Sequence, residues 1–333
     1  MKNTTLLLTI IIALIFISCA PKPKFKAYVP ATNSGTKVVY KDKIVEKEKI
    51  VYKDKVVYKD KIVYQGGAVN SAENTRKNFS NSAQQFNFKK NKREDYNSYA
   101  LIIGINEYKE NSNVAYADYS ALAFEKLVNT TFGVPKDNIV TMLNADASSG
   151  QIKAKLDYIK EIPEKGGTIY LFYAGHGVPG KDGHVYMLPA DMSAGNIHLE
   201  PNLQLRKIYA NLTKSLASNI FIFMDSCFSG QDDNGDLLYK GVAAATMVNK
   251  TKIRNKKLTV MTAGADHDFA NNYEDKKQRL FSYHLIKELA NGTKNLQNIY
   301  SKIRSKVKRT SLQKGTAYKQ VPQLYGTITK SLY

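Results

Sequence analysis

Cysteine is scarce in this chain of 333 residues, which contains Cys19, Cys227 and no other. Because Cys19 closes an apolar N-terminal run, Cys227 is left without a partner, and a disulfide framework is excluded. An unpaired thiol in an oxidising compartment is a liability unless it is buried, paired between chains or chemically useful. The segment around Cys227 therefore decides between a small buried apolar residue and a reactive one.

Several motifs that carry cofactors are also absent. The chain has no phosphate-binding loop, no dinucleotide fingerprint and no zinc-ligand spacing, and we predict that it requires no cofactor. It has no recognition helix or aromatic RNA-binding motif, so the net charge of +20 does not indicate nucleic acid, and no nucleic-acid partner is predicted. The apolar run at residues 6–17 is too short for a comfortable membrane span.

Residues 1–18 are predicted to be a secretory signal, with Lys2 as its positive start and Ser18-Cys19 as its processing site. Phe-Ile-Ser-Cys at residues 16–19 resembles a bacterial lipobox, in which the cysteine is lipidated and becomes the new N-terminus. This resemblance implies a lipoprotein of the bacterial cell envelope, held to a membrane through lipid on Cys19. An uncleaved anchor and a plain signal peptide are the alternatives. Ala20 provides no retention signal of the Asp type, so the outer membrane is the preferred location.

A repeat of period six follows, with KVVYKD, KIVEKE, KIVYKD, KVVYKD and KIVYQ in succession. Six residues match neither a coiled coil nor an amphipathic helix, and the Val, Ile and Tyr content favours extended structure. We predict a linker over residues 19–36, a stalk over residues 37–65, and a flexible Ser/Asn/Gln-rich linker over residues 66–96. Fully extended, at about 3.3 Å per residue, residues 20–96 could hold a domain on the order of 200 Å from its anchor.

Roughly half of the positive excess lies in residues 20–96. An anionic lipid or cell-wall polymer of the envelope would suit such a stalk as a partner. A solvated, self-repelling spacer accounts for the same charge with no partner at all.

Strands and helices alternate from residue 97 to the C-terminus, and this pattern predicts a single α/β domain over residues 97–333 with a mainly parallel sheet flanked by helices on both faces. The predicted strands are 99–105, 168–174, 219–225 and 257–263, and the predicted helices are 117–131, 149–161, 203–217, 281–291 and 295–309.

Two of the strands end in turns that carry chemistry. TIYLFYAGHG (residues 168–177) presents His176 between two glycines, and NIFIFMDSCFSG (residues 219–230) presents Cys227. If the strands are parallel neighbours, they lie about 4.8 Å apart and their carboxyl ends share one edge of the sheet, where sites in α/β folds are found. A thiol and an imidazole at that edge are the minimal activated nucleophile.

The AGHG and DSCFSG motifs, in this order, resemble the catalytic motifs of the caspase-like cysteine peptidases, and most closely those of the metacaspase and bacterial branch. ALIIGINEY, YADYSALAFEKL, GHVYMLPAD and KLTVMTAGADHDFA resemble further segments of that family in collinear order. The resemblance implies a caspase-like three-layer sandwich and a cysteine endopeptidase that acts on proteins or peptides. One departure is Phe228, where metacaspases usually carry a histidine.

The resemblance also implies roles for the residues at the sheet edge. Cys227 would be the nucleophile, His176 the general base and acid, and the backbone N–H groups of Gly177 and Cys227 the oxyanion hole. No third member of a triad is evident, and the family generally works with a dyad. Some relatives are activated by calcium, but residues 182–191 hold no clear acidic cluster and residues 232–236 have glycine at the wrong offset for an EF-hand. Calcium activation therefore stays open, and no metal ligand is assigned.

Two carboxylates are candidates for substrate binding, because the resemblance places Asp118 and Asp225 in the family's first specificity pocket. Asp225 lies two residues before Cys227 and faces the same side of an extended strand. Asp118 opens a predicted helix, where a carboxylate is also common for stability alone. Two carboxylates in one pocket favour Arg or Lys before the cut bond, and the basic linker 240–257 is then a candidate for self-cleavage.

Two other functions fit the same residues. A non-catalytic envelope lipoprotein could use the fold as a binding module or scaffold, although such a module needs neither His176 nor Cys227. Another acyl hydrolase or a transpeptidase could use the same dyad, and only product analysis separates it from a peptidase.

Overall fold

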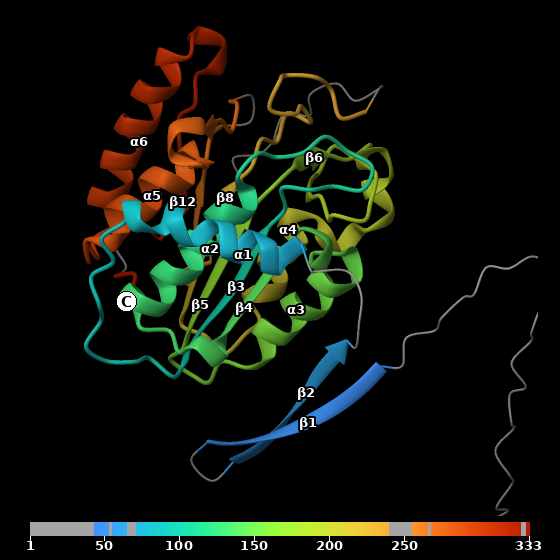
Figure 1. Ribbon diagram of the computed structural model, residues 1–333, viewed down its shortest axis with the longest axis vertical. Helices are drawn as coiled ribbons and strands as arrows, with labels where there is room; N and C mark the ends of the chain where they lie inside the picture. The colour runs from blue at the N-terminus through green and yellow to red at the C-terminus, as the bar shows by residue number, and fades with distance from the viewer. Residues whose placement is uncertain (1–42, 53–54, 65–70, 240–254, 266–267, 328–330) are drawn as a thin grey trace, which may run out of the picture. The chain divides into compact units, whose positions relative to one another are not determined.

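Figure 1 shows the computed structural model of the chain. It describes residues 43–52, 55–64, 71–239, 255–265, 268–327 and 331–333. These residues divide into two compact units, Met1–Gly67 and Ala68–Tyr333, of which the second holds the predicted domain. The signal segment, the predicted linker 19–36 and residues 240–254 of the basic linker lie outside the described residues.

The described residues of the first unit form a hairpin built from the period-six repeat. Strands β1 (Lys43–Tyr52) and β2 (Lys55–Tyr64) pair antiparallel from Tyr52 opposite Lys55 to Lys43 opposite Tyr64. The repeat is therefore extended, as its Val, Ile and Tyr content predicts, but the chain folds back on itself. Two ten-residue strands side by side span about 33 Å, which is half the reach of the same residues in line.

The second unit is organised around a six-stranded sheet of order β12-β9-β8-β5-β3-β4, in which only β12 runs antiparallel. This arrangement confirms the mainly parallel sheet. The strands are β3 (Ser98–Gly104), β4 (Ile139–Leu143), β5 (Thr168–Ala174), β8 (Asn219–Asp225), β9 (Leu258–Thr262) and β12 (Gln323–Gly326). Two small antiparallel pairs lie outside the sheet: β6 (Gly177–Pro179) with β7 (Val185–Met187), and β10 (Asn272–Tyr273) with β11 (Gln278–Arg279).

Helices cover both faces of the sheet (Figure 1). One layer consists of α1 (Ser71–Ser82), α2 (Ala117–Leu127), α5 (Leu280–Ala290) and α6 (Leu296–Gln313), and the other of α3 (Ser149–Glu161) and α4 (Leu205–Leu212). Short helical turns cover Ala83–Gln85, Val128–Phe132, Lys136–Asn138, Asn144–Asp146, Ala194–Leu199, Pro201–Leu203, Glu274–Lys276 and Thr316–Tyr318. No helix in the described part of the chain has both the length and the apolarity to cross a lipid bilayer.

Aromatic packing fixes α2 against the central strands. The ring of Phe124 on α2 stacks on Phe172 of β5 at 4.5 Å and contacts Phe223 of β8 at 5.3 Å between centroids. A glycine at the end of β3 lets the helix approach, since a Cβ at Gly104 would lie 2.5 Å from the Cβ of Ala121. This close approach sets the first turn of α2 at the carboxyl edge of the sheet.

The structure differs from the flexible linker predicted over residues 66–96. Its described residues, 71–96, belong to the second unit, and the side chains of Phe79 and Phe86 are buried in the core of that unit. The backbone N–H of Lys89 donates to the carbonyl of Ala290 at the end of α5. The Ser/Asn/Gln-rich composition indicated disorder, but two phenylalanines supply enough apolar surface to hold the segment in place.

Candidate active site

The carboxyl ends of β5 and β8 form the candidate active site. The two strands pair in parallel up to Ala174 opposite Asp225, and the N–H of Gly175 donates to the Asp225 carbonyl at 3.3 Å. His176 and Cys227 therefore each lie two residues beyond the same pair of residues in the ladder. The shared edge is the one that the strand pattern predicts.

The two turns are in direct contact through Gly177. A Cβ at this position would lie 2.6 Å from the carbonyl oxygen of Cys227 and 2.4 Å from a ring carbon of Phe228. Only glycine allows the histidine turn to approach the cysteine turn this closely. The buried ring of Phe228 fills the place beside this contact.

His176 is 4% exposed and held in one orientation. Its Nε2 lies 2.8 Å from the carbonyl oxygen of Ser112, and because a carbonyl can only accept, Nε2 carries the proton. Nδ1 is then the nitrogen with the lone pair. Burial lowers the pKa of the imidazole below its ordinary 6.5, while the Ser112 carbonyl opposes that shift, so the ring is neutral at pH 7. The Ser112 carbonyl thus orients the imidazole. Because this group belongs to the backbone, no residue type in the sequence indicates it.

Two tyrosines support the histidine turn. The ring of Tyr108 packs on the imidazole at 4.8 Å between centroids, and its hydroxyl accepts from the His176 backbone N–H at 2.8 Å. The hydroxyl of Tyr173 lies 2.6 Å from the carbonyl of His176 and 3.1 Å from that of Leu188. The turn is therefore held on both sides by buried hydrogen bonds.

Cys227 is buried as a neutral thiol. Its Sγ accepts a hydrogen bond from the backbone N–H of Ala270, in the loop that follows β9. Burial raises the thiol pKa to about 12, although the Ala270 N–H lowers it somewhat. Among the hydrogen bonds of the described residues, none joins Sγ to the imidazole of His176. The resting site therefore holds a neutral thiol and a neutral imidazole on two turns that touch at Gly177.

Alkylation of Cys227 in the folded chain should be slow and strongly pH-dependent. A pKa of about 12 in place of 9.0 lowers the thiolate fraction near neutral pH by about 10³. The rate should rise about tenfold per pH unit above pH 7 without levelling off below pH 10. Site-resolved mass spectrometry after iodoacetamide treatment measures it, with the urea-unfolded chain as control. A plateau near pH 8 would contradict the buried neutral thiol.

Asp225 ends β8 inside the protein, with no exposed surface. Its Oδ2 accepts from both the backbone N–H (2.9 Å) and the hydroxyl (2.6 Å) of Ser282. Its Oδ1 faces the Nε of Arg279 at 3.9 Å. Burial raises the pKa of this carboxyl, whereas Arg279 and Ser282 lower it. Asp225 therefore has the charged partner that an acid at the end of a buried strand requires.

Asp118 lies at the first turn of α2 with a different set of partners. Its carboxylate accepts from its neighbour's N–H, from the Thr75 hydroxyl at 3.3 Å and from the Asn144 amide at 3.4 Å. Burial raises its pKa, and Glu107 is the charged group that adds to the rise. In the described part of the chain no hydrogen bond or ion pair joins Asp118 to Asp225. The structure does not bring the two carboxylates into contact, and their shared pocket stays a prediction.

The acidic residues at the ends of the 182–191 stretch do not fit a calcium ion. The carboxylate of Asp182 accepts from the Tyr186 hydroxyl and the His184 N–H, and that of Asp191 accepts from Ser149. Across the described residues, no three His, Cys, Asp or Glu side chains are grouped so as to hold a metal. These oxygens serve the local fold singly, so no step of a mechanism is derived through calcium.

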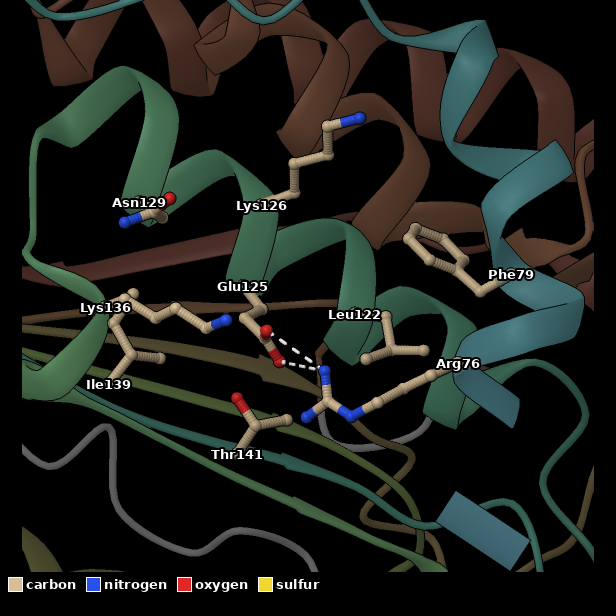
Figure 2. Close-up of a pocket in the computed structure, with 9 residues that line it drawn as sticks. All are labelled: Arg76, Phe79, Leu122, Glu125, Lys126, Asn129, Lys136, Ile139 and Thr141. Carbon is tan, nitrogen blue, oxygen red and sulfur yellow. Dashed lines mark hydrogen bonds and ion pairs between the residues drawn. The ribbon is translucent and has the colours of Figure 1, made fainter. Parts of the chain in front are cut away.

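A separate cavity of about 790 Å³ lies between α1, α2 and β4, three strands along the sheet from Cys227 (Figure 2). Figure 2 shows Arg76 of α1 and Glu125 of α2 pointing toward each other across it, with an ion pair of 3.1 Å. Phe79 and Leu122 supply its apolar wall. None of the described residues that line the cavity carries a thiol or an imidazole, and the cavity marks the place where α1 packs against α2.

Sequence reasoning did not identify the charged cluster around Arg279. This residue is 2% exposed, and its Nη1 contacts the Asp233 carboxylate at 2.7 and 2.9 Å. Burial alone would lower its pKa, but Asp233 and Asp225 together raise it above the ordinary value. The two acids lie 46 and 54 positions away along the chain, and a pair so distant leaves no periodic signal in the sequence.

The chain matches a family model described as the caspase domain over residues 97–333. Among solved structures, a structural-genomics protein from Geobacter sulfurreducens is similar at 17% identity, covering 70% of this chain and 97% of that one with a TM-score of 0.48. Caspase-1 from Spodoptera frugiperda is similar at 14% identity, with 73% and 94% covered and a TM-score of 0.44. A structure of pro-sf-caspase-1 gives 14% identity, 73% and 92% coverage, and a TM-score of 0.47.

No curated protein matches the chain. The family model nevertheless spans most of the chain and the whole of the sheet with both its turns. By this match, the protein belongs to the caspase domain family and has a fold of the cysteine-peptidase kind.

Proposed function

We propose that the protein is an exported, lipid-anchored cysteine endopeptidase in which Cys227 is the nucleophile and His176 the general base and acid. The observation that carries this proposal is the Ser112 carbonyl on Nε2 of His176. It assigns the proton to Nε2 and leaves Nδ1 as the basic nitrogen, at the sheet edge where Cys227 lies.

In the first half of the reaction, substrate binding brings the thiol within reach of Nδ1. The imidazole takes the Sγ proton, and the thiolate attacks the scissile carbonyl carbon to form a tetrahedral adduct. The backbone N–H groups of Gly177 and Cys227 would stabilise its oxyanion. The C–N bond then breaks, the imidazolium gives its proton to the leaving amine, and a thioester remains on Cys227.

In the second half, water replaces the amine. Nδ1 of His176 takes a proton from the water, the hydroxide attacks the thioester carbonyl, and the carbon–sulfur bond breaks. The thiolate recovers the proton, and the carboxylic acid product leaves. Tyr108 and Tyr173 hold the imidazole turn fixed through both halves.

The proposed substrates carry Arg or Lys before the cut bond. Asp225 supports this specificity because its buried carboxylate lies two residues from Cys227 and already binds a guanidinium of the same chain. Asp118 lies farther along the sheet edge, and we propose that it contributes a second negative charge. The basic linker 240–257 carries such residues after the nucleophile and is the proposed site of self-cleavage.

A panel of fluorogenic peptides tests both activity and specificity. The full-length chain in detergent should hydrolyse peptides with Arg or Lys before the reporter at least tenfold faster, in kcat/KM, than matched peptides with Asp or Leu. The physical reason is the excess of carboxylate around the pocket. A Cys227→Ala chain purified in the same way is the control. Preferential cleavage after Asp would contradict the pocket assignment.

Product analysis distinguishes a peptidase from the other functions that the sequence leaves open. Addition of a second peptide amine to the assay would yield a new amide with a transpeptidase and only free acid with a hydrolase. If the chain binds peptides without cleaving them, and Cys227→Ala binds them equally well, the protein is a scaffold.

Anchoring through Cys19 is part of the same proposal and rests on the lipobox-like segment. The mature protein should begin at a lipid-modified Cys19 and partition into the detergent phase, because two or more acyl chains give stable membrane attachment. Mass spectrometry of the N-terminal peptide from a bacterial host measures this. Cys19→Ser should move the protein to the aqueous phase or leave it unprocessed. An unmodified N-terminus elsewhere in the unsubstituted chain would contradict the anchor.

A further inference from the structure

Arg279 is a fully charged side chain inside the protein, directly before α5. A buried guanidinium persists only where carboxylates and carbonyls take the place of water. Its Nη1 binds both oxygens of Asp233, and its Nη2 donates to the carbonyl of Ala270. The N–H of Ala270 in turn donates to Sγ of Cys227. Ala270 therefore links the guanidinium to the candidate nucleophile, since it contacts both.

The inner side of this guanidinium is incompletely bound. Asp225 Oδ1 and Arg279 Nε face each other at 3.9 Å, which is about 1 Å too long for a hydrogen bond. Among the described residues, neither atom has another hydrogen-bond partner. Asp225 Oδ2 is saturated by Ser282. The cation is thus held firmly by the outer acid, Asp233, and loosely by the inner acid. The fully buried carboxylate of Asp225 therefore keeps one oxygen available for a better-placed donor.

The outer acid belongs to a segment that contacts two other segments of the site. Asp233 also accepts from the N–H of Ala115 at 3.3 Å, in the loop that carries Ser112. The same segment contacts the histidine side, where the hydroxyl of Tyr239 donates to the Pro179 carbonyl. The guanidinium therefore lies between the inner acid and Asp233, whose side chain is 17% exposed.

We propose that Arg279 is a built-in occupant of the primary specificity pocket, and that a substrate's cationic side chain binds between Asp225 and Asp233 by displacing it. This inference rests on the proposed function and deepens it by naming the residue that sets the pocket's selectivity. Two guanidinium groups cannot share one buried site, since like charges repel strongly where water is excluded. An incoming cation must therefore replace Arg279 rather than join it.

The need to displace Arg279 makes the pocket selective for cations. An apolar or acidic side chain that removed Arg279 would leave Asp225 buried without a counter-charge, which is strongly unfavourable. Only a cation restores the charge balance. Arg279 thus weakens the binding of every ligand, and it weakens the binding of uncharged ligands most. The pocket gains specificity for cations because the other ligands bind less well.

Binding of a small guanidinium tests the exchange without any turnover. Ethylguanidinium is titrated into the full-length chain by isothermal titration calorimetry, before and after Arg279→Met, which keeps the side-chain volume and removes the charge. The variant should bind at least tenfold more tightly than the unsubstituted chain. Neutral ethylurea should bind to neither, and a further Asp225→Asn substitution should abolish the gain. Arg206→Met, at an exposed arginine, is the matched control and should change nothing.

The outcomes separate this inference from the peptidase proposal, because no bond is cut in the assay. Equal ethylguanidinium affinity in a folded Arg279→Met chain would overturn the inference, even if the protein cleaves peptides. If the variant does not fold alone, refolding in the presence of ethylguanidinium decides: recovery supports a pocket that needs a cation. Failure to recover, with ethylurea as the comparison, shows instead that Arg279 is a fixed structural residue.

Discussion

Cys227→Ala is expected to remove all measurable peptide hydrolysis. Loss of the nucleophile eliminates the thioester pathway, and the remaining groups can only orient water, so kcat should fall by more than about 10⁴. The fold should survive, since the substitution removes one sulfur atom and leaves the buried N–H of Ala270 without its acceptor. That loss costs about 1–3 kcal/mol in the free energy of unfolding. Peptidase rates and urea denaturation of the same preparation measure the two effects.

His176→Ala should reduce kcat by about 10²–10⁴ through loss of the general base. The double substitution should be no worse than Cys227→Ala alone, because the two residues act as one unit. His184→Ala and His198→Ala are matched controls at partly exposed histidines and should retain the activity of the unsubstituted chain. Full activity in either Cys227→Ala or His176→Ala would show that the dyad assignment is wrong.

Asp225→Ala is expected to destabilise the protein by about 3–5 kcal/mol, the range found when one partner of a buried ion pair is removed. The substitution leaves Ser282 without its acceptor and takes one of the two carboxylates away from Arg279. Urea denaturation monitored by circular dichroism measures the loss. Activity toward Arg peptides should fall as well, because the inner acid of the pocket is gone.

A double-mutant cycle shows whether the ion pair of Asp225 with Arg279 causes this loss of stability. Asp225→Ala combined with Arg279→Met removes both buried charges, so the double variant should be more stable than the sum of the two single losses indicates. Asp236 is an exposed acid in the loop that carries Asp233, and Asp236→Ala should alter the free energy of unfolding by less than about 0.5 kcal/mol. Strict additivity in the cycle would mean that Asp225 is stabilised by Ser282 alone.

The long buried strands could be predicted from the sequence almost to the residue, because continuous Ile, Phe and Tyr runs that end in glycine or aspartate allow little else. The short edge strands β4 and β12 were not predicted, since four or five residues of mixed polarity carry no clear period. Helix α1 was also missed. Its sequence, SAENTRKNFSNS, has little apolar character, and the helix exists because Phe79 packs against Tyr119 of α2.

The candidate site divides in the same way. His176, Gly177 and Cys227 follow from strand ends, which are local in sequence, and the structure places all three at one edge. The partners that tune them come from distant segments. Ser112 acts through a backbone carbonyl, which has no residue-type signature, and Arg279 meets its acids only when the sheet has formed. Backbone groups and long-range ion pairs are the features that a single sequence does not reveal.

The parallel register of β5 and β8 also determines when the site comes into being. Ala174 and Asp225 face each other across the ladder although 51 positions separate them in the chain. Closing a loop of that length is entropically unfavourable until the contacts of the sheet offset the lost entropy. Non-local parallel pairing is therefore slow among folding events. Neither turn is complete without the other strand, so a nascent or partly folded chain holds a thiol and an imidazole that have never met. Reactivity at this edge is accordingly a property of the finished fold, acquired late and lost as soon as those two strands separate.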